Sequence, residues 1–132
     1  MSGRKLAAAL VAILLLAIVL PVVVATQVNA RRVAQAQDDV RRIAQETRLQ
    51  GPAVLAGEGA APKSALAMGW LDAKAGSARV PPDPWGNQYL IVVSANPPAV
   101  TVLSAGPNGI VETGFSEVGT PTGDDICYQS RR

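Results

Sequence analysis

Histidine is absent from this 132-residue sequence, and cysteine occurs once, at Cys127. Without imidazole there are no Ser-His catalytic pairs, and zinc sites lose their commonest nitrogen ligand. Ser104 has no histidine or lysine placed to activate it as a nucleophile, and the two aspartates Asp124 and Asp125 are simply neighbours in the sequence. No pair of nucleophile and base is apparent, so we expect no enzymatic activity. A single cysteine excludes a disulfide within the chain. Cys127 is interpreted as a small, partly buried apolar residue, with an intermolecular bridge or a reactive thiol as the alternative.

Aromatic residues make up only 4% of a sequence that is 48% apolar. A domain of this composition has few large side chains to bury, so a bound ion or partner subunits are expected to supplement its core. Basic and acidic groups are also separated along the chain. Residues 1–48 carry seven basic and three acidic side chains, whereas residues 49–130 carry three basic and seven acidic ones. An acidic globular part argues against binding of nucleic acid.

No charge occurs between Lys5 and Arg31, and residues 6–25 are apolar without a break. Twenty helical residues span about 30 Å, which matches the hydrocarbon core of a bilayer. We therefore interpret residues 1–27 as a membrane-spanning N-terminal helix. Because Arg4 and Lys5 precede the apolar run, the N-terminus is expected to stay in the cytoplasm while the rest of the chain is exported.

Two other interpretations of this segment remain open. It is compatible with a cleaved signal peptide, because the sequences ending at Ala25 and Ala30 both carry the small residues of a cleavage site. It is also compatible with the buried helix of a soluble protein. The apolar core of an ordinary signal peptide has about 7–15 residues, so the longer run over residues 6–25 favours a helix that is retained.

The helical pattern continues beyond the apolar run. Residues 28–50 contain neither glycine nor proline, and apolar residues recur there at the spacing of one helix face: Val33, Ala36, Val40, Ile43 and Ala44. Asp38 with Arg42, and Arg42 with Glu46, have the i,i+4 spacing of ion pairs on a helix. Gly51-Pro52 predicts the end of the helix. Residues 28–50 are therefore interpreted as an amphipathic continuation that packs on the globular part.

Residues 51–132 are expected to form a small globular α+β head. The predicted elements are a loop, a short helix and two strands joined by an Asn-Pro-Pro turn: residues 51–62, 63–75, 88–94 and 99–104. In the short helix, Leu66 and Trp70 are expected to face inward. The strands contain several valines, which suit a pleated and half-buried surface.

The most distinctive segment precedes the first of these strands and reads Pro82-Asp83-Pro84-Trp85-Gly86-Asn87-Gln88-Tyr89. Asp83 and Asn87 are expected to fix a turn through their side chains, as aspartate and asparagine commonly do. Trp85 is expected to fill the gap between helix and sheet, with stacking on a ligand as the alternative.

A loop rich in glycine, asparagine and aspartate follows the second strand, over residues 104–126. About twenty residues without regular structure are long for a compact domain and are usually either functional or disordered. Calcium takes about six to eight oxygen ligands from carboxylates, amides and carbonyls. The loop offers side-chain or carbonyl oxygens of this kind at Leu103, Asn108, Val111, Asp124 and Asp125. A solvated acidic loop is the alternative, and the EF-hand pattern is absent.

The order of these features resembles the major pseudopilins of type II secretion, which belong to the type IV pilin-like family. The resemblance covers the long helix with Pro21, the Asp-Pro-Trp-Gly-Asn-x-Tyr element at 83–89 and the loop at 104–126. Ser104–Gly109 is similar to the family's Ser-Leu-Gly-Ala-Asp-Gly segment, with Asn108 in the place of the aspartate. Gly123–Ile126 is similar to its late aspartate-rich segment.

This resemblance implies a pilin-like fold, in which the N-terminal helix packs on a small antiparallel β-sheet. It implies a calcium ion in the loop, held by Leu103, Asn108, Val111, Asp124 and Asp125. Glu112 and Glu117 are candidates to supply the formal charge that Asn108 lacks. It also implies a structural function: the chain is a subunit of a pilin-like filament, which assembles through its N-terminal helix and moves cargo mechanically.

The implied partners are copies of the chain in a helical filament, other pseudopilins, the inner-membrane assembly platform and, before assembly, membrane lipid. The implied location is the inner membrane, with a single span and the C-terminal head in the periplasm, or a periplasmic or extracellular filament. The alternative function is a secreted or periplasmic calcium-binding module whose signal peptide is removed.

One motif departs from the family. The prepilin peptidase site of pseudopilins is a glycine followed by phenylalanine or methionine, with glutamate at the fifth mature position. Here Arg4 follows Gly3, and Ala8 stands at the fifth position. This difference puts cleavage and N-methylation at Gly3 in question.

Overall fold

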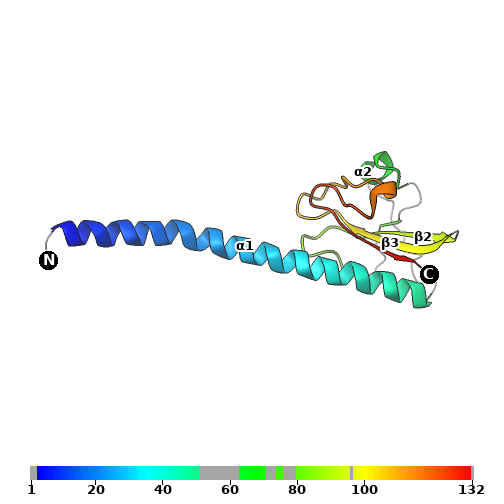
Figure 1. Ribbon diagram of the computed structural model, residues 1–132, viewed down its shortest axis with the longest axis horizontal. Coiled ribbons are helices and arrows are strands. Elements are labelled where there is room, and N and C mark those ends of the chain that lie inside the picture. The colour runs from blue at the N-terminus through cyan, green and yellow to red at the C-terminus, as the bar shows by residue number, and fades with distance from the viewer. Residues whose placement is uncertain (1–2, 51–62, 71–73, 76–79, 96, 132) are drawn as a thin grey trace. The chain divides into compact units, whose positions relative to one another are not determined.

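The computed structural model describes residues 3–50, 63–70, 74–75, 80–95 and 97–131. The elements in chain order are helix α1 (Gly3–Gln50), helix α2 (Lys63–Ala67), strands β1 (Lys74–Ala75), β2 (Leu90–Ala95) and β3 (Pro98–Ser104), the short 3-10 helix η2 (Phe115–Glu117) and strand β4 (Ile126–Arg131) (Figure 1). The chain divides into two compact units, Met1–Arg32 and Val33–Arg132, which are described in turn.

The first unit is the N-terminal part of α1. Its leucine, isoleucine and valine side chains are exposed all around the helix, from Leu6 to Val28. Pro21 lies inside the helix, which continues on both sides of it even though proline removes one backbone hydrogen bond. Among the described residues, α1 is the helix that is long and apolar enough to cross a membrane, and signal sequences share this property. The segment is therefore a candidate membrane span or signal sequence.

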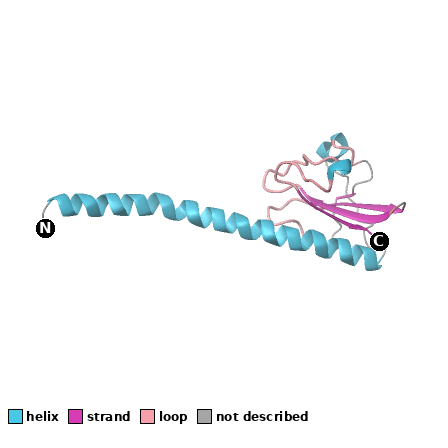
Figure 2. Ribbon diagram, in the orientation of Figure 1, coloured by secondary structure: helices cyan, strands magenta, loops and turns pink. Residues whose placement is uncertain are grey.

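The second unit is built on a four-stranded antiparallel sheet in the order β1-β2-β3-β4 (Figure 2). β2 and β3 form a hairpin in which Leu90 lies opposite Leu103 and Val93 opposite Val100. β4 pairs with β3 over six residues. The long helix and this sheet together confirm the expected α+β class.

The C-terminal part of α1 covers one face of the sheet. A buried cluster joins it to alternate residues of the strands and their flanks: Ala36, Val40, Ile43, Ala44, Tyr89, Ile91, Val100, Val102 and Ile126. Val33, Val80, Trp85 and Tyr128 are partly buried against this cluster. The apolar helix stripe predicted from the sequence therefore packs on the sheet as expected, and Trp85 lies beside the same core.

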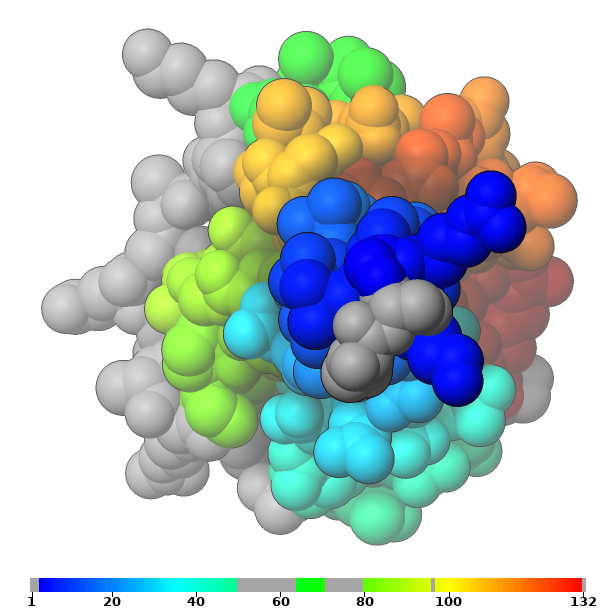
Figure 3. Space-filling view, turned by 90° about the vertical axis from the view of Figure 1, so that its left-hand side faces the viewer, coloured from blue at the N-terminus to red at the C-terminus, as the bar shows by residue number. Residues whose placement is uncertain are grey.

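The opposite face of the sheet has a second core. Its buried members are Ala65, Trp70, Leu90, Val92, Leu103, Ala105, Val111 and Val118. Leu90 and Ile91 belong to different cores because successive residues of a strand point to opposite faces. The indole of Trp70 is fully buried and donates a hydrogen bond to the carbonyl of Thr113 at 2.7 Å. Its ring meets that of Phe115 edge to face, with centroids 5.5 Å apart. Figure 3 shows α2 (green) beside the yellow-to-orange segment that leads to η2.

Two sequence predictions about the head were wrong, and one strand was missed. The short helix ends at Ala67 rather than at residue 75, because a turn at Met68 and Gly69 carries Trp70 into the core, and residues 74–75 pair with β2 as a strand. Leu66 is 47% exposed and does not face inward. Strand β4 was not predicted at all.

The predicted ion pairs on α1 were also wrong. Arg42 pairs with Asp39 at 2.8 Å, one turn earlier on the helix, rather than with Asp38 or Glu46. Asp39 also accepts a hydrogen bond from the hydroxyl of Tyr89 at 3.3 Å. Burial, followed by the charge of Asp39, raises the pKa of Tyr89 well above its ordinary value. The carboxylate of Asp39 thus ties the helix to the sheet.

Candidate functional site

Asp83 is the centre of a buried hydrogen-bond network at the start of the Asp-Pro-Trp-Gly-Asn segment. The residue is only 3% exposed. Its Oδ1 accepts bonds from the backbone N–H groups of Trp85 at 3.1 Å and Asn87 at 2.7 Å. Its Oδ2 accepts from the Ser104 hydroxyl at 2.6 Å and from the Asn87 amide at 3.4 Å. The aspartate therefore fixes the turn, as predicted, and also joins it to the end of β3.

Asn87 extends this network into the C-terminal loop. Its side-chain amide donates to the carbonyl of Gly106 at 2.8 Å, and the backbone N–H of Gly106 donates to the Ser104 hydroxyl at 3.3 Å. The Asn87 side-chain oxygen lies 3.0 Å from the position that a Cβ would take on Gly109. The turn at residues 83–87 thus holds the first part of the loop in place.

Asn108 connects the two halves of the loop. Its backbone N–H donates to Oδ2 of Asp124 at 3.0 Å, and its side-chain amide donates to Oε2 of Glu112 at 3.2 Å. Its side-chain oxygen accepts from the backbone N–H of Ile110 at 2.7 Å. Three residues that the sequence selected as cation ligands or as compensating charges therefore contact one another directly.

Asp125 lies deeper in the loop and is 5% exposed. Its Oδ2 accepts from the backbone N–H groups of Glu112 at 2.7 Å and Thr113 at 2.6 Å. Burial is the main cause that raises the pKa of Asp125, and the two backbone bonds oppose it. An acid with a raised folded pKa stabilises the fold most below its ordinary pKa, and this contribution is lost as pH rises through the folded pKa. Ionisation of Asp125 is therefore a cost to the fold, and a bound cation would relieve it.

Two glycines allow the strands of the loop to approach closely. Gly106 and Gly123 both have positive φ, at +63° and +67°. A Cβ on Gly106 would collide with the backbone carbonyl of Asp124, and one on Gly123 would collide with the carboxylate of Glu112. At Gly106 a side chain would meet the Asp124 backbone and push the two halves of the loop apart. At Gly123 the Glu112 side chain could move aside, but the positive φ still favours glycine there.

Two carboxylate oxygens of this loop are candidates to hold a cation. Oδ1 of Asp124 and Oδ1 of Asp125 are buried and have no hydrogen-bond partner within the described part of the chain, and a buried carboxylate oxygen normally has one. Leu103 and Val111 are buried in the second core, so only their backbone carbonyls are available as ligands. Glu117 is exposed and bonds to the N–H of Gly114. The described carboxylates alone do not form a group of three metal ligands, so a cation would need carbonyl and amide oxygens as well.

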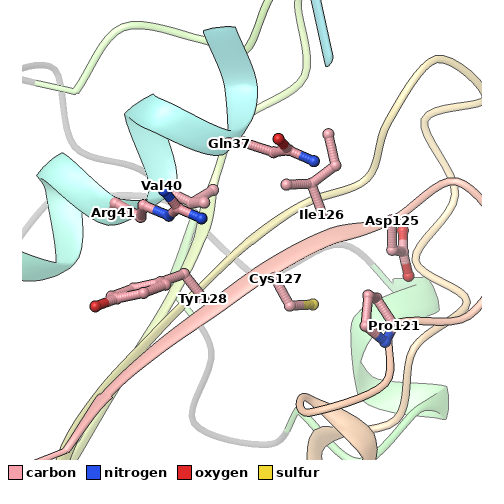
Figure 4. A pocket seen from close by; sticks show the side chains of 8 residues that line it. All are labelled: Gln37, Val40, Arg41, Pro121, Asp125, Ile126, Cys127 and Tyr128. Atoms are coloured by element: carbon pink, nitrogen blue, oxygen red, sulfur yellow. The ribbon is translucent and has the colours of Figure 1, made fainter. Parts of the chain in front are cut away.

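A pocket of about 200 Å³ lies between α1 and β4 (Figure 4). It is lined by Gln37, Val40, Arg41, Pro121, Asp125, Ile126, Cys127 and Tyr128.

Cys127 is partly buried beside the second core and is a free thiol. Burial, followed by the charge of Asp125, raises the pKa of Cys127 to about 12. The residue therefore has the character of a small apolar group, as the sequence suggested.

Cys127 is expected to react slowly with alkylating reagents. Only the thiolate is nucleophilic, and a pKa near 12 leaves very little thiolate at pH 8. In the folded chain we expect iodoacetamide to label Cys127 at least about tenfold more slowly than in urea. The measurement is a time course of intact mass. Equal rates in the folded and unfolded states would show that the thiol is accessible and reactive.

The sequence placed Ser104 and Thr113 within the 104–126 loop but predicted no hydrogen bond for either hydroxyl. The Ser104 hydroxyl bridges Asp83 and Gly106, and the Thr113 hydroxyl accepts from the N–H of Thr122 at 2.8 Å. Serine and threonine carry no distinctive signal in a loop, and these contacts span from two to twenty-one positions of sequence.

No protein-family model, curated protein or solved structure matches the chain.

Proposed function

We propose that this chain is a structural subunit of a type IV pilin-like filament, such as the pseudopilus of type II secretion. The main support for this proposal is that the two parts of α1 differ in burial. Its C-terminal part buries a stripe of side chains against the sheet, while the side chains of residues 3–32 are exposed. The apolar part of the helix is thus left for a lipid bilayer or for the helices of other copies.

An exposed apolar helix of this kind is unstable in water. Burying one valine, leucine or isoleucine side chain is worth about 1.5–3 kcal/mol, and more than ten such side chains are exposed between Leu6 and Val28. We propose that this helix spans the inner membrane before assembly and then packs with the helices of neighbouring copies in the core of the filament. The head stays on the periplasmic side and forms the outer surface.

The work of such a subunit is mechanical and needs no catalytic group. Asp83 and Ser104 lie 2.6 Å apart, but the aspartate is already used by the turn, and no histidine exists in the chain. We therefore propose that the chain is not an enzyme. Its partners are copies of itself, other pseudopilins and the membrane platform that assembles them.

Calcium binding by the loop is part of this proposal. The ion is held by the carboxylates of Asp124 and Asp125, the side chain of Asn108 and the carbonyls of Leu103 and Val111, with Glu112 close by. The two unpartnered carboxylate oxygens support it. A cation there would cross-link the two halves of the loop and stiffen the surface of the head.

Calcium is expected to raise the thermal stability of the full chain in detergent relative to EDTA. A ligand at a hundred times its Kd stabilises by about 2.7 kcal/mol, which corresponds to an increase in Tm of about 11–22 °C for a head of this size. The double variant D124N/D125N should lose this response while remaining at least as stable as the wild type in EDTA. N108D should respond at lower calcium. Identical melting curves of the wild-type protein with calcium and with EDTA would contradict the calcium site.

The filament proposal is tested by the intact mass of the protein in membrane, soluble and sheared-surface fractions of its host. We expect a full-length species, or one trimmed only near Gly3, in membranes and in sheared filaments. A soluble species that begins near Thr26 or Arg31 would instead identify a secreted or periplasmic module with a cleaved signal peptide. In that case the loop at 104–125 would be the place to look for its ligand.

A further inference from the structure

One stretch of the head carries only negative charge, and the head's lysines and arginines lie on either side of it in the sequence, at 63–79 and 131–132. Residues 80–130 contain five carboxylates and no lysine or arginine. Asp83 is enclosed in its turn, and the other four lie in the C-terminal loop: Glu112, Glu117, Asp124 and Asp125. Their hydrogen-bond donors are neutral, namely backbone N–H groups and the amide of Asn108.

Asp125 shows that this charge is not neutralised inside the head. It is 95% buried, and one of its oxygens has no partner among the described residues. Arg41 lines the same pocket as Asp125 (Figure 4), but the two form no ion pair within 4 Å. In the part of the chain that the structure describes, the ion pair found is Arg42 with Asp39. Glu117 is exposed and forms no ion pair among the described residues, so its charge is available to a positively charged partner.

The complementary charge is on α1. Arg31 and Arg32 are adjacent, exposed on the helix, and form no ion pair or side-chain hydrogen bond with any described residue. Arg42 and Arg48, by contrast, contact Asp39 and Ser130. One copy of the chain therefore presents a basic helix segment and an acidic loop, and neither is satisfied within the described residues.

We propose that Arg31 and Arg32 of one copy bind the acidic loop of a neighbouring copy, with Glu117 and Glu112 as their nearest partners. The inference rests on the proposed filament function. Glu117 is the most exposed carboxylate of the loop, and a cation held by Asp124 and Asp125 would leave it free. A contact between two different surfaces of the same chain repeats from copy to copy, and it builds a filament where the repeated rotation does not close into a ring. Complementary charges of this kind also set the register between neighbours.

Two charge-reversed variants test the contact in the full-length protein. R31E/R32E makes the helix segment acidic, and S116K/E117K makes the loop basic. Both loop positions are exposed, so neither change disturbs a core. Each variant alone should reduce the yield of sheared filaments at least about tenfold, because like charges then face each other at every contact. The matched control is R131E/R132E, which reverses another Arg-Arg pair and should assemble normally.

Expression of both variants together is the decisive step. In an alternating filament, each acidic helix meets a basic loop, and each basic helix meets an acidic loop, so the mixture should assemble like the wild type. Rescue by combining all four changes in one chain, without rescue by the mixture, would place the contact within a single chain and overturn the inference.

Two further outcomes separate this inference from the function on which it rests. If the wild-type chain forms no filament, the proposed function fails first. If the wild type assembles and R31E/R32E assembles equally well, the interface is wrong while the function stands. A variant R31E/R32E that leaves the membrane fraction but keeps its filament yield would assign the two arginines to lipid headgroups instead.

Discussion

Replacement of Asp83 by alanine is expected to destabilise the head by about 3–5 kcal/mol, because four hydrogen bonds end on this one carboxylate. The buried Ser104 hydroxyl and the partly buried backbone N–H groups of Trp85 and Asn87 would be left without their acceptor. A loss of this size is a large part of the about 5–15 kcal/mol that stabilises an ordinary domain. The measurement is urea unfolding of the full chain in detergent, followed by tryptophan fluorescence.

Two milder variants rank the contributions within this network. S104A removes one donor together with one of the four bonds, so we expect a loss of about 1–2 kcal/mol. D83N keeps the shape of the side chain but cannot accept on both of its terminal atoms, and it should fall between S104A and D83A. The loop is tied to the same network through Asn87 and Gly106, so D83A should also weaken its response to calcium. Stability of D83A within about 0.5 kcal/mol of the wild type would show that the network is dispensable.

Val40→Asp is expected to separate the helix from the sheet. Val40 is 1% exposed and belongs to the core that joins α1 to β2, β3 and β4. The change removes an apolar contact worth about 1.5–3 kcal/mol and buries a charged carboxylate in an apolar cluster, which costs several kcal/mol more. The sum of about 4–6 kcal/mol is comparable to the stability of the whole head.

Limited proteolysis and near-ultraviolet circular dichroism report this change, since Tyr89 and Trp85 lie in or beside the same core. We expect rapid cleavage of the head and loss of the aromatic signal. The matched control is Gln45→Asp, the same new side chain at an exposed position of the same helix; its stability should change by less than about 0.5 kcal/mol. Equal behaviour of the two variants would mean that the helix stripe contributes little to the fold.

The parts of the fold that sequence predicted are those with a local signal. The stripe from Val33 to Ala44 has helical period, and β2 and β3 are short apolar runs on either side of a proline-containing turn. β1 and β4 lack such a signal: β1 has two residues, and β4 reads Ile-Cys-Tyr-Gln-Ser-Arg. Both are strands because a neighbouring strand offers hydrogen bonds, and that is a property of the tertiary fold.

The candidate site was predicted in the same partial way. Residue type selected Asn108, Asp124 and Asp125, because amide and carboxylate oxygens are recognisable in any sequence. It did not reveal that Asp125 accepts from the N–H groups of Glu112 and Thr113, or that Asp83 anchors the end of β3. These bonds join residues 12 or more positions apart, and the chain must be folded before they exist.

The core beneath α1 brings together residues that are far apart in the sequence and are therefore synthesised at different times. Ala36 and Val40 lie near the beginning of the chain, whereas Ile126 of the same cluster is separated from them by more than eighty positions. Contacts of such high sequence separation form late in folding, because the entropy cost of closing a long loop comes before the contact can contribute any stabilising free energy. The core beneath the helix is therefore complete only when β4 has joined β2 and β3. In the exported chain that we propose, the head would complete its folding only after nearly all of it has crossed the membrane.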